Sequence, residues 1–168
     1  VATGMVIEGK AGFQIMGDWA KGEFTAAGKV PGVDYYCSPT PSNNGYLYNV
    51  DSFIFYKTSD PDKQEGQKLL AKLMMGKNFQ KVFNLYKGSI PARLDVPMDE
   101  FDKCAKTSNA DIKTAGAKGG LVPSFAHGMA QGNTMKAALQ DIITEHFNSD
   151  MSSVDAANAL ADSVLANM

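Results

Sequence analysis

The sequence predicts an α-rich protein of the mixed α/β class with few strands. Several long segments carry apolar residues at helical spacing, while one segment, residues 50–57, is rich in β-branched and aromatic residues. The chain has 168 residues, of which 44% are hydrophobic, enough for the core of one ordinary domain or a large part of something bigger. A folded protein with little sheet is therefore expected.

The first fifty residues predict a short strand, a helix and a loop. The stretch KAGFQIMG, residues 10–17, has the composition of a buried strand. Asp18 can then cap a helix that carries Trp19 and Phe24 and closes at Gly28. Prolines, asparagines and glycines fill residues 29–49, which predicts a loop with at most short extended pieces.

The middle of the chain predicts one strand followed by two helices. VDSFIFYK, residues 50–57, is the best strand candidate. Residues 59–76 begin with a capping residue and Pro61, end at glycine and place several leucines on one face, which indicates a helix. Residues 77–88 form a second, shorter helix by the same spacing argument.

The last eighty residues predict mainly helices. Pro91 and Pro97 exclude a helix over residues 89–97. Residues 98–120 are expected to be helix broken by polar turns. Residues 134–147 and 152–167 have apolar helical faces, and the second begins with a sequence that fits a capping box.

Composition excludes several classes of protein. The net charge is −2 and the basic residues are not clustered, so neither nucleic acid nor an anionic membrane is an expected partner. No apolar run approaches the roughly 20 residues of a membrane span. Neither a signal-peptide pattern nor an initial Met is present, so the chain is expected to be processed or a piece of a longer polypeptide.

The two cysteines, Cys37 and Cys104, are 67 residues apart and belong to no zinc-binding pattern, so no metal is expected. They are either two buried thiols or one disulfide bond, and spacing alone does not decide between these alternatives.

Four polar or aromatic residues are candidates for a binding site: Trp19, Asp51, Lys87 and His127. Taken singly, each has an ordinary structural role, in the core, at a strand start, after a helix or in a surface loop. Taken together, they suit a sugar. An indole covers the C–H face of the ring, and carboxylate, ammonium and imidazole groups donate to and accept from its hydroxyls.

Motifs along the whole chain carry a resemblance to a known family. GKAGFQIMGDWAKGEF, VDSFIF, KLLAKLMM, KGSIPAR and VPSFAHGMA occur in order and are followed by a final amphipathic helix. The chain resembles the C-terminal part of the extracytoplasmic sugar-binding proteins of bacterial ABC importers, and most closely the glucose-binding group among them. MGDWAKGEF and KGSIPAR are the more specific of these motifs.

The resemblance implies a two-lobed periplasmic solute-binding fold of the α/β class with a type II hinge. Residues 1–42 and 89–168 would belong to the C-terminal lobe. Residues 43–88 would complete the N-terminal lobe and include the hinge crossings. The remaining part of the N-terminal lobe would come from a missing N-terminal part of the same protein.

The resemblance also implies the function. Trp19 would stack on the sugar, Asp51, Lys87 and His127 would bind its hydroxyls, and no cofactor would be needed. The sugar would be a monosaccharide, with glucose favoured, and the permease subunits of an ABC importer would be the partner. Location in the periplasm would favour a disulfide between Cys37 and Cys104.

Two other functions remain as alternatives. The same fold could bind another hexose, a disaccharide or a polyol, since stacking aromatics and carboxylates serve all of these. A carbohydrate-active enzyme would need a nucleophile and base, such as a cysteine with His127, or a carboxylate pair such as Glu23 with Asp51. No flanking nucleophile motif supports an enzyme.

Overall fold

The computed structural model describes residues 1–41 and 45–167. Residues 42–44, part of the expected loop, lie outside the described residues. The chain divides into two compact units, each formed from two segments. The first unit comprises Val1–Tyr46 and Ser52–Gly120, and the second comprises Leu47–Asp51 and Leu121–Met168. These units follow packing within the chain, and the lobe boundaries expected from the sequence stay a prediction.

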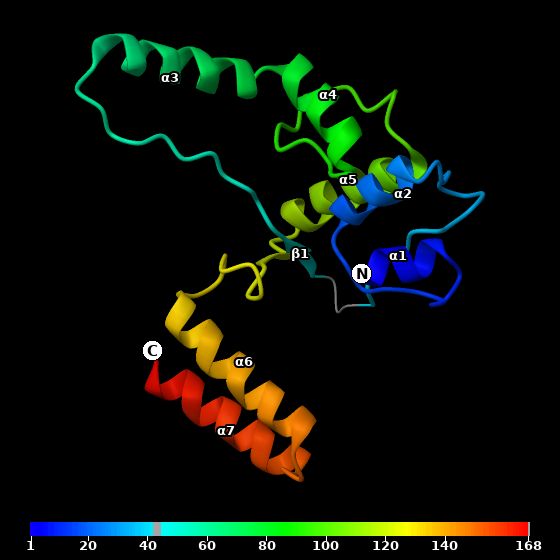
Figure 1. The fold of residues 1–168 in the computed structure, drawn as a ribbon, viewed down its shortest axis with the longest axis vertical. Helices are drawn as coiled ribbons and strands as arrows, with labels where there is room; N and C mark the ends of the chain where they lie inside the picture. The colour runs from blue at the N-terminus through cyan, green and yellow to red at the C-terminus, as the bar shows by residue number, and fades with distance from the viewer. Residues whose placement is uncertain (42–44, 168) are drawn as a thin grey trace. The chain divides into compact units, whose positions relative to one another are not determined.

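The first unit is helical (Figure 1). Its elements are α1 (Ala2–Ile7), the 3-10 turn η1 (Asp18–Ala20), α2 (Lys21–Ala26), α3 (Pro61–Met74), α4 (Lys77–Lys87) and α5 (Lys103–Ala117). The second unit contains α6 (Asn133–Asn148) and α7 (Ser153–Ala166). Two short strands, β1 (Tyr46–Tyr48) and β2 (Leu121–Pro123), form the sheet. The predicted α-rich chain with little sheet is confirmed.

The sequence signals for α3 and α4 are confirmed. The Asp60 side chain accepts hydrogen bonds from the first free backbone N–H groups of α3, and Pro61 occupies its first turn. Gly88 ends α4 in the left-handed conformation, with a φ of 88° that favours glycine. Both helices therefore begin and end close to the residues that their capping patterns indicated.

A small apolar core lies where α4, the proline-containing segment and α5 meet. Val96, Phe101 and Ala105 are buried. Partly buried apolar residues pack against them: Leu85, Ile90 and Met98. The segment over residues 89–97 is not helical, as predicted, and it supplies Val96 to this core.

Helix α5 corrects the prediction of a helix broken by polar turns. It runs without interruption from Lys103 to Ala117, and Asp102 caps its start by accepting from the N–H of Ala105. Its polar residues are accommodated along the helix. Ser108, for example, is bonded at 2.6 Å to the hydroxyl of Tyr46. The polar residues of this segment therefore did not indicate a break in the helix.

The two strands are parallel. The N–H of Tyr46 donates to the carbonyl of Gly120, and the N–H of Ser124 donates to the carbonyl of Tyr48. Residue numbers thus rise together along both strands, as in a parallel pair. Strand β2 was not anticipated from the sequence, and β1 is one of the short extended pieces expected in the loop.

The second unit is built mainly from the α6–α7 hairpin, whose helices lie side by side (Figure 1). The Ser152 hydroxyl accepts from the N–H of Asp155 and donates to its carboxylate, at 3.1 and 2.7 Å. These contacts confirm Ser152 as the cap of the last helix, with the Asp155 carboxylate bonded to the Ser152 hydroxyl.

Both strands predicted from composition are absent as strands. Residues 10–17 and 50–57 form no ladder with any described residue. Phe13 and Ile15 in the first segment, and Ile54 and Tyr56 in the second, are exposed. A strand requires a partner for its backbone groups, and composition alone does not supply one. The start of the chain instead forms helix α1, which the sequence analysis missed.

Across residues 1–41 and 45–167, no helix combines the length and apolarity required to cross a bilayer. Nor do these residues bring together three or more His, Cys, Asp or Glu side chains that could hold a metal ion.

Candidate functional site

Trp19 lies in η1, at the head of α2, and is half-buried. Its indole folds back over Gly17, so closely that a Cβ on Gly17 would overlap three ring carbons. Only a residue without a side chain permits this ring position. The glycine two residues before the tryptophan therefore fixes where the indole lies.

Asp18 corrects the prediction that its side chain caps the helix. No side-chain cap is present at η1, whose flanking residue is Gly17. The Asp18 carboxylate instead accepts from the N–H of Ile90 at 3.1 Å. Burial raises the pKa of Asp18, opposed by this hydrogen bond and by the charges of Lys21 and Lys87. Asp18 thus joins the Trp19 turn to the segment after α4.

Lys87 is the last residue of α4, where a cation is favoured by the helix dipole. Its ammonium lies 5.8 Å from the centre of the Phe83 ring. The backbone of Lys87 packs tightly against α2, since a Cβ on Gly22 would lie 2.8 Å from the Lys87 carbonyl oxygen. This close approach brings the start of α2 and the end of α4 together.

Trp19 and Lys87 therefore stand on neighbouring segments of the first unit. The carboxylate of Asp18, the residue next to Trp19, accepts a hydrogen bond from the N–H of Ile90. The charge of Lys87 opposes the rise that burial causes in the pKa of Asp18. Asp18 is thus a link between these segments that sequence reasoning missed. No sequence signal gave the pairing, because it joins residues 72 positions apart.

Asp51 belongs to the second unit and follows β1 by three residues. It was expected to open a strand, but no strand begins there. Its side chain is exposed and accepts from the amide of Asn49 at 3.1 Å. The carboxylate therefore lies in an irregular segment directly after β1.

His127 lies in the turn that follows β2, also in the second unit. The residue is exposed, and its Nδ1 lies 2.7 Å from the Oγ of Ser124. Ser124 is only 2% exposed. A Ser–His pair can act in nucleophilic catalysis, but a hydroxyl this deeply buried is closed to a substrate. The pair is better explained as support for the imidazole.

Asp51 and His127 both follow the carboxyl ends of adjacent parallel strands. In open sheets with parallel strands, ligands bind in the crevice outside those ends. The structure thus brings the two residues to one edge of one small sheet. The sequence did not predict this arrangement, because it did not predict β2. Among the four candidates, the first unit contributes Trp19 and Lys87, and the second contributes Asp51 and His127.

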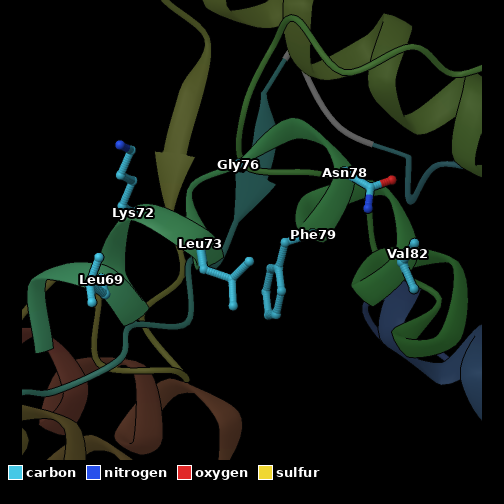
Figure 2. A pocket seen from close by; sticks show the side chains of 7 residues that line it. All are labelled: Leu69, Lys72, Leu73, Gly76, Asn78, Phe79 and Val82. Atoms are coloured by element: carbon cyan, nitrogen blue, oxygen red, sulfur yellow. The ribbon is translucent and has the colours of Figure 1, made fainter. Parts of the chain in front are cut away.

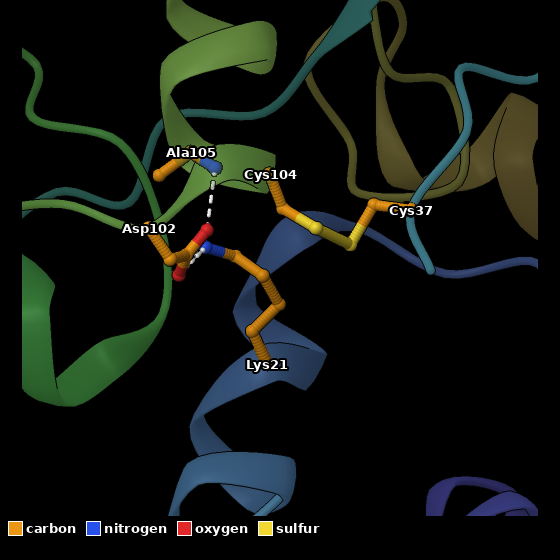
Figure 3. Close-up of a disulfide and its surroundings, with 5 residues drawn as sticks. All are labelled: Lys21, Cys37, Asp102, Cys104 and Ala105. Atoms are coloured by element: carbon orange, nitrogen blue, oxygen red, sulfur yellow. Dashed lines mark hydrogen bonds and ion pairs between the residues drawn. A yellow bond between two sulfur atoms is a disulfide. The ribbon is translucent and has the colours of Figure 1, made fainter. Parts of the chain in front are cut away.

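The disulfide between Cys37 and Cys104, implied by the resemblance, is confirmed, with the two Cα atoms 5.7 Å apart. It joins the loop after α2 to the first turn of α5 (Figure 3). Both sulfur atoms are in the bond, so neither cysteine is a free nucleophile for the enzyme alternative. The carboxylate pair of that alternative, Glu23 and Asp51, is divided between the two units.

An ion pair lies beside the disulfide (Figure 3). The Nζ of Lys21 is 2.7 Å from Oδ2 of Asp102, and the Lys21 side chain is 7% exposed. The other carboxylate oxygen of Asp102 caps α5. The lysine of the motif MGDWAKGEF is therefore a structural residue that fastens α2 to α5.

An open apolar hollow of about 550 Å³ lies along α3 and the start of α4 (Figure 2). Leu73 and Phe79 lie in the middle of it, and Lys72 points away. The remaining lining residues are Leu69, Gly76, Asn78 and Val82. None of the four candidate residues lines it, although Lys87 lines a neighbouring hollow on α4. An apolar lining does not match the polar rim of a sugar.

No model of a known protein family matches the chain. Curated proteins with similar sequences do match the chain. The chain is 47% identical over 165 residues to a probable sugar-binding periplasmic protein of Brucella suis, an alignment that covers 98% of this chain and 39% of the relative. It is 44% identical over 165 residues to a protein of the same name from Rhizobium meliloti, covering 98% of this chain and 40% of that relative.

A more distant relative has a different sugar in its name. A xylose/arabinose-binding protein of Haloferax volcanii is 28% identical over 161 residues, which are 95% of this chain and 34% of the relative. The chain thus spans well under half the length of these relatives, as expected for one portion of such a protein. The names of the bacterial relatives confirm the periplasmic location expected from the sequence.

Proposed function

We propose that this chain is part of the sugar-binding subunit of a bacterial ABC importer, and that it binds a monosaccharide, with glucose favoured. Its relatives are named as sugar-binding periplasmic proteins. The observation that carries the proposal is the position of Asp51 and His127 after the carboxyl ends of two adjacent parallel strands. The permease subunits would be the partner that receives the sugar.

Trp19 and Lys87 are the contribution of the first unit to this proposal. The indole, held over Gly17, offers one flat apolar face to the C–H side of a pyranose. The ammonium of Lys87 donates to sugar hydroxyls, and its position is supported by the Phe83 ring at 5.8 Å. The turn and the helix end that carry them are tied through Asp18.

Asp51 and His127 are the contribution of the second unit. A carboxylate accepts from two neighbouring hydroxyls through charge-assisted hydrogen bonds. A neutral imidazole donates or accepts according to its tautomer. A sugar that lacks a matching hydroxyl leaves one of these groups unpaired, at about 1–3 kcal/mol for each buried hydrogen bond.

A sugar that touches residues of both predicted lobes would also couple the lobes. A ligand shifts a conformational equilibrium only by its different affinity for the two states. In a hinge protein the state in which all contacts form is therefore stabilised by the ligand. We propose that this state is the one that the permease recognises, and that no covalent bond of the sugar changes.

A pentose is the second candidate ligand, because the Haloferax relative is named for xylose and arabinose. A pentopyranose has the same C–H faces but lacks the hydroxymethyl group of a hexose. Another hexose, a disaccharide or a polyol also fits the types of side chain involved. These sugars differ in their hydroxyls, so affinity for each separates them.

Calorimetric titration of the natural full-length polypeptide tests the proposal. Glucose, galactose, xylose and arabinose should be compared, and we expect the largest affinity for glucose. Trp19→Ala and Asp51→Ala should each abolish binding in the folded protein, while Lys87→Ala should weaken it without changing the order of the sugars. Phe147→Ala, which removes an exposed aromatic ring on α6, is the matched control. Unchanged affinity in both Trp19→Ala and Asp51→Ala would refute the site.

A further inference from the structure

Ser124 is the most deeply buried polar residue near the proposed site. It directly follows β2 and is 2% exposed, whereas His127, three residues later, is exposed. The Oγ of Ser124 lies 2.7 Å from Nδ1 of His127. The side chain therefore reaches the imidazole from the protein interior and leaves the opposite ring nitrogen, Nε2, on the far side of the ring.

The backbone around Ser124 is held on both sides. Its N–H donates to the carbonyl of Tyr48 at 2.8 Å, and its carbonyl accepts from the N–H of Met129 at 2.9 Å. Within this turn, the N–H of Gly128 donates to the carbonyl of Phe125 at 3.0 Å, and Gly128 has a φ of 71°. The turn that carries His127 is thus closed by hydrogen bonds at both ends.

The direction of the Ser124–His127 hydrogen bond follows from burial. A buried hydroxyl must place its hydrogen on an acceptor, since leaving it unpaired is unfavourable. Nδ1 of His127 is the partner of this hydroxyl within the described part of the chain. If Nδ1 carried the ring proton, both groups would donate and the hydroxyl hydrogen would have no acceptor. The arrangement therefore favours a hydroxyl that donates to an unprotonated Nδ1.

We infer that Ser124 is a positioning residue that holds His127 as the tautomer with its proton on Nε2, so that the imidazole donates a hydrogen bond to a sugar oxygen. The role toward sugar rests on the proposed function. Ser124 itself does not touch the ligand. The sugar oxygen opposite Nε2 must accept, so it is a hydroxyl or the ring oxygen.

Nuclear magnetic resonance of the histidine ring nitrogens tests the tautomer without any sugar. In the natural full-length polypeptide with 15N-labelled histidine, His127 should show the proton on Nε2. His146 is an internal control that should have the opposite tautomer. Its Nδ1 lies 2.9 Å from the Met151 carbonyl oxygen, which can only accept a hydrogen bond. His146 should therefore show the proton on Nδ1.

Two variants of Ser124 complete this test. Ser124→Ala should move His127 toward a mixture of tautomers and leave the His146 signals unchanged. Ser124→Thr, which keeps a hydroxyl, should restore the Nε2 tautomer. A proton on Nδ1 of His127 in the natural protein, or ring signals unaffected by Ser124→Ala, would overturn the inference.

A double-mutant cycle on glucose affinity tests the connection to function. Ser124→Ala should weaken affinity about five- to tenfold, the worth of one ordinary hydrogen bond. In a His127→Ala background the same change should alter affinity less than about twofold, because the group that Ser124 positions is gone. Equal losses in both backgrounds would mean a merely structural role. If no sugar binds the natural protein, the proposed function fails, and the ring signals still decide the tautomer.

Discussion

Gly17→Ala is the substitution that most directly tests how the tryptophan is held. Gly17 has a φ of −68° and a ψ of 164°, which alanine adopts without strain. The added methyl group has no room, however, because it would overlap the indole of Trp19. The substitution thus leaves the backbone preference intact and acts on the ring alone.

The size of the effect follows from the overlap. Adding a methyl group to a well-packed site typically costs about 1–3 kcal/mol, since a side chain must leave its preferred position. Alanine also reduces the freedom of the unfolded chain, which favours folding by about 0.4–1 kcal/mol. The net loss in unfolding free energy for Gly17→Ala should therefore be about 1–2 kcal/mol. Sugar affinity should fall as well, because the ring that stacks on it has moved.

Urea unfolding of the full-length protein measures the first effect and calorimetry measures the second. Each should be repeated in a Trp19→Ala background, where no ring opposes the methyl group. In that background Gly17→Ala should be neutral or stabilising by up to about 1 kcal/mol. Gly12→Ala is a matched control, since a Cβ on Gly12 meets no atom within 4 Å.

A loss of stability that is the same with and without the indole would refute the reasoning. The collision with Trp19 would then not be the cause, and Gly17 would matter for another reason. A Gly17→Ala protein with unchanged stability and unchanged sugar affinity would show that the indole does not lie over Gly17.

Three further predictions concern stability. Lys21→Met should lower the unfolding free energy by about 2 kcal/mol in urea titrations. This is less than the roughly 3–5 kcal/mol of a fully buried pair, because the partner Asp102 is 33% exposed. As a control, Lys68→Met removes an exposed ion pair on α3 and should change the unfolding free energy by less than about 0.5 kcal/mol. Reduction of the disulfide should lower the unfolding free energy by about 4 kcal/mol, the entropy of closing a loop of 67 residues, and equal urea midpoints with and without reductant would contradict this. Burial raises the pKa of Asp18, so its charge opposes folding at neutral pH and the stability of the natural protein rises as the pH falls through that raised pKa. The unfolding free energy of Asp18→Asn relative to the natural protein should therefore decline as the pH falls from neutral toward the ordinary pKa of an aspartate, and a difference independent of pH would count against a partly buried carboxylate.

The helices were predictable because their signals are local. The Asp60 cap with Pro61, the glycine that ends α4 and the Ser152–Asp155 pair all act within a few residues of the helix they define. Each needs no knowledge of the rest of the chain. Helix α1 lacks such signals, since no side chain caps it, and it was missed.

The strands were not predictable because pairing is not local. Residues 50–57 have the composition of a strand but form no strand pairing with any described residue, whereas the three residues of β2 pair with β1 across more than seventy positions. The composition of β2 gives no strand signal. The backbone hydrogen bonds that join the two segments, such as those of Tyr46 with Gly120 and of Ser124 with Tyr48, make them strands. Composition thus identified a segment suited to a sheet, and the pairing decided which segments formed one.

The candidate residues were chosen for their chemistry, and the structure adds the residues that hold them. Gly17 makes room for the indole, Asp18 ties its turn to Ile90, and Ser124 supports His127. A glycine, a partly buried carboxylate and a buried hydroxyl give no signal in a single sequence, because each is common. Their roles follow from the structure: the overlap that a Cβ on Gly17 would make with the indole, the hydrogen bond of Asp18 to Ile90, and the burial of Ser124 beside His127.

The predicted division of the four residues between two lobes bears on how selectivity would arise. If one sugar contacts Trp19 and His127 from the predicted C-terminal lobe and Asp51 and Lys87 from the predicted N-terminal lobe, the loss of either pair removes the differential affinity on which a hinge depends. A variant of one pair should then lower affinity and also weaken the response of the hinge to any sugar that still binds. A substitution that only loosens one pair, such as Ser124→Ala, should lower affinity while leaving that response in place, because all four contacts can still form. Affinity and hinge closure should therefore separate between variants that remove a ligand group and variants that only misplace one.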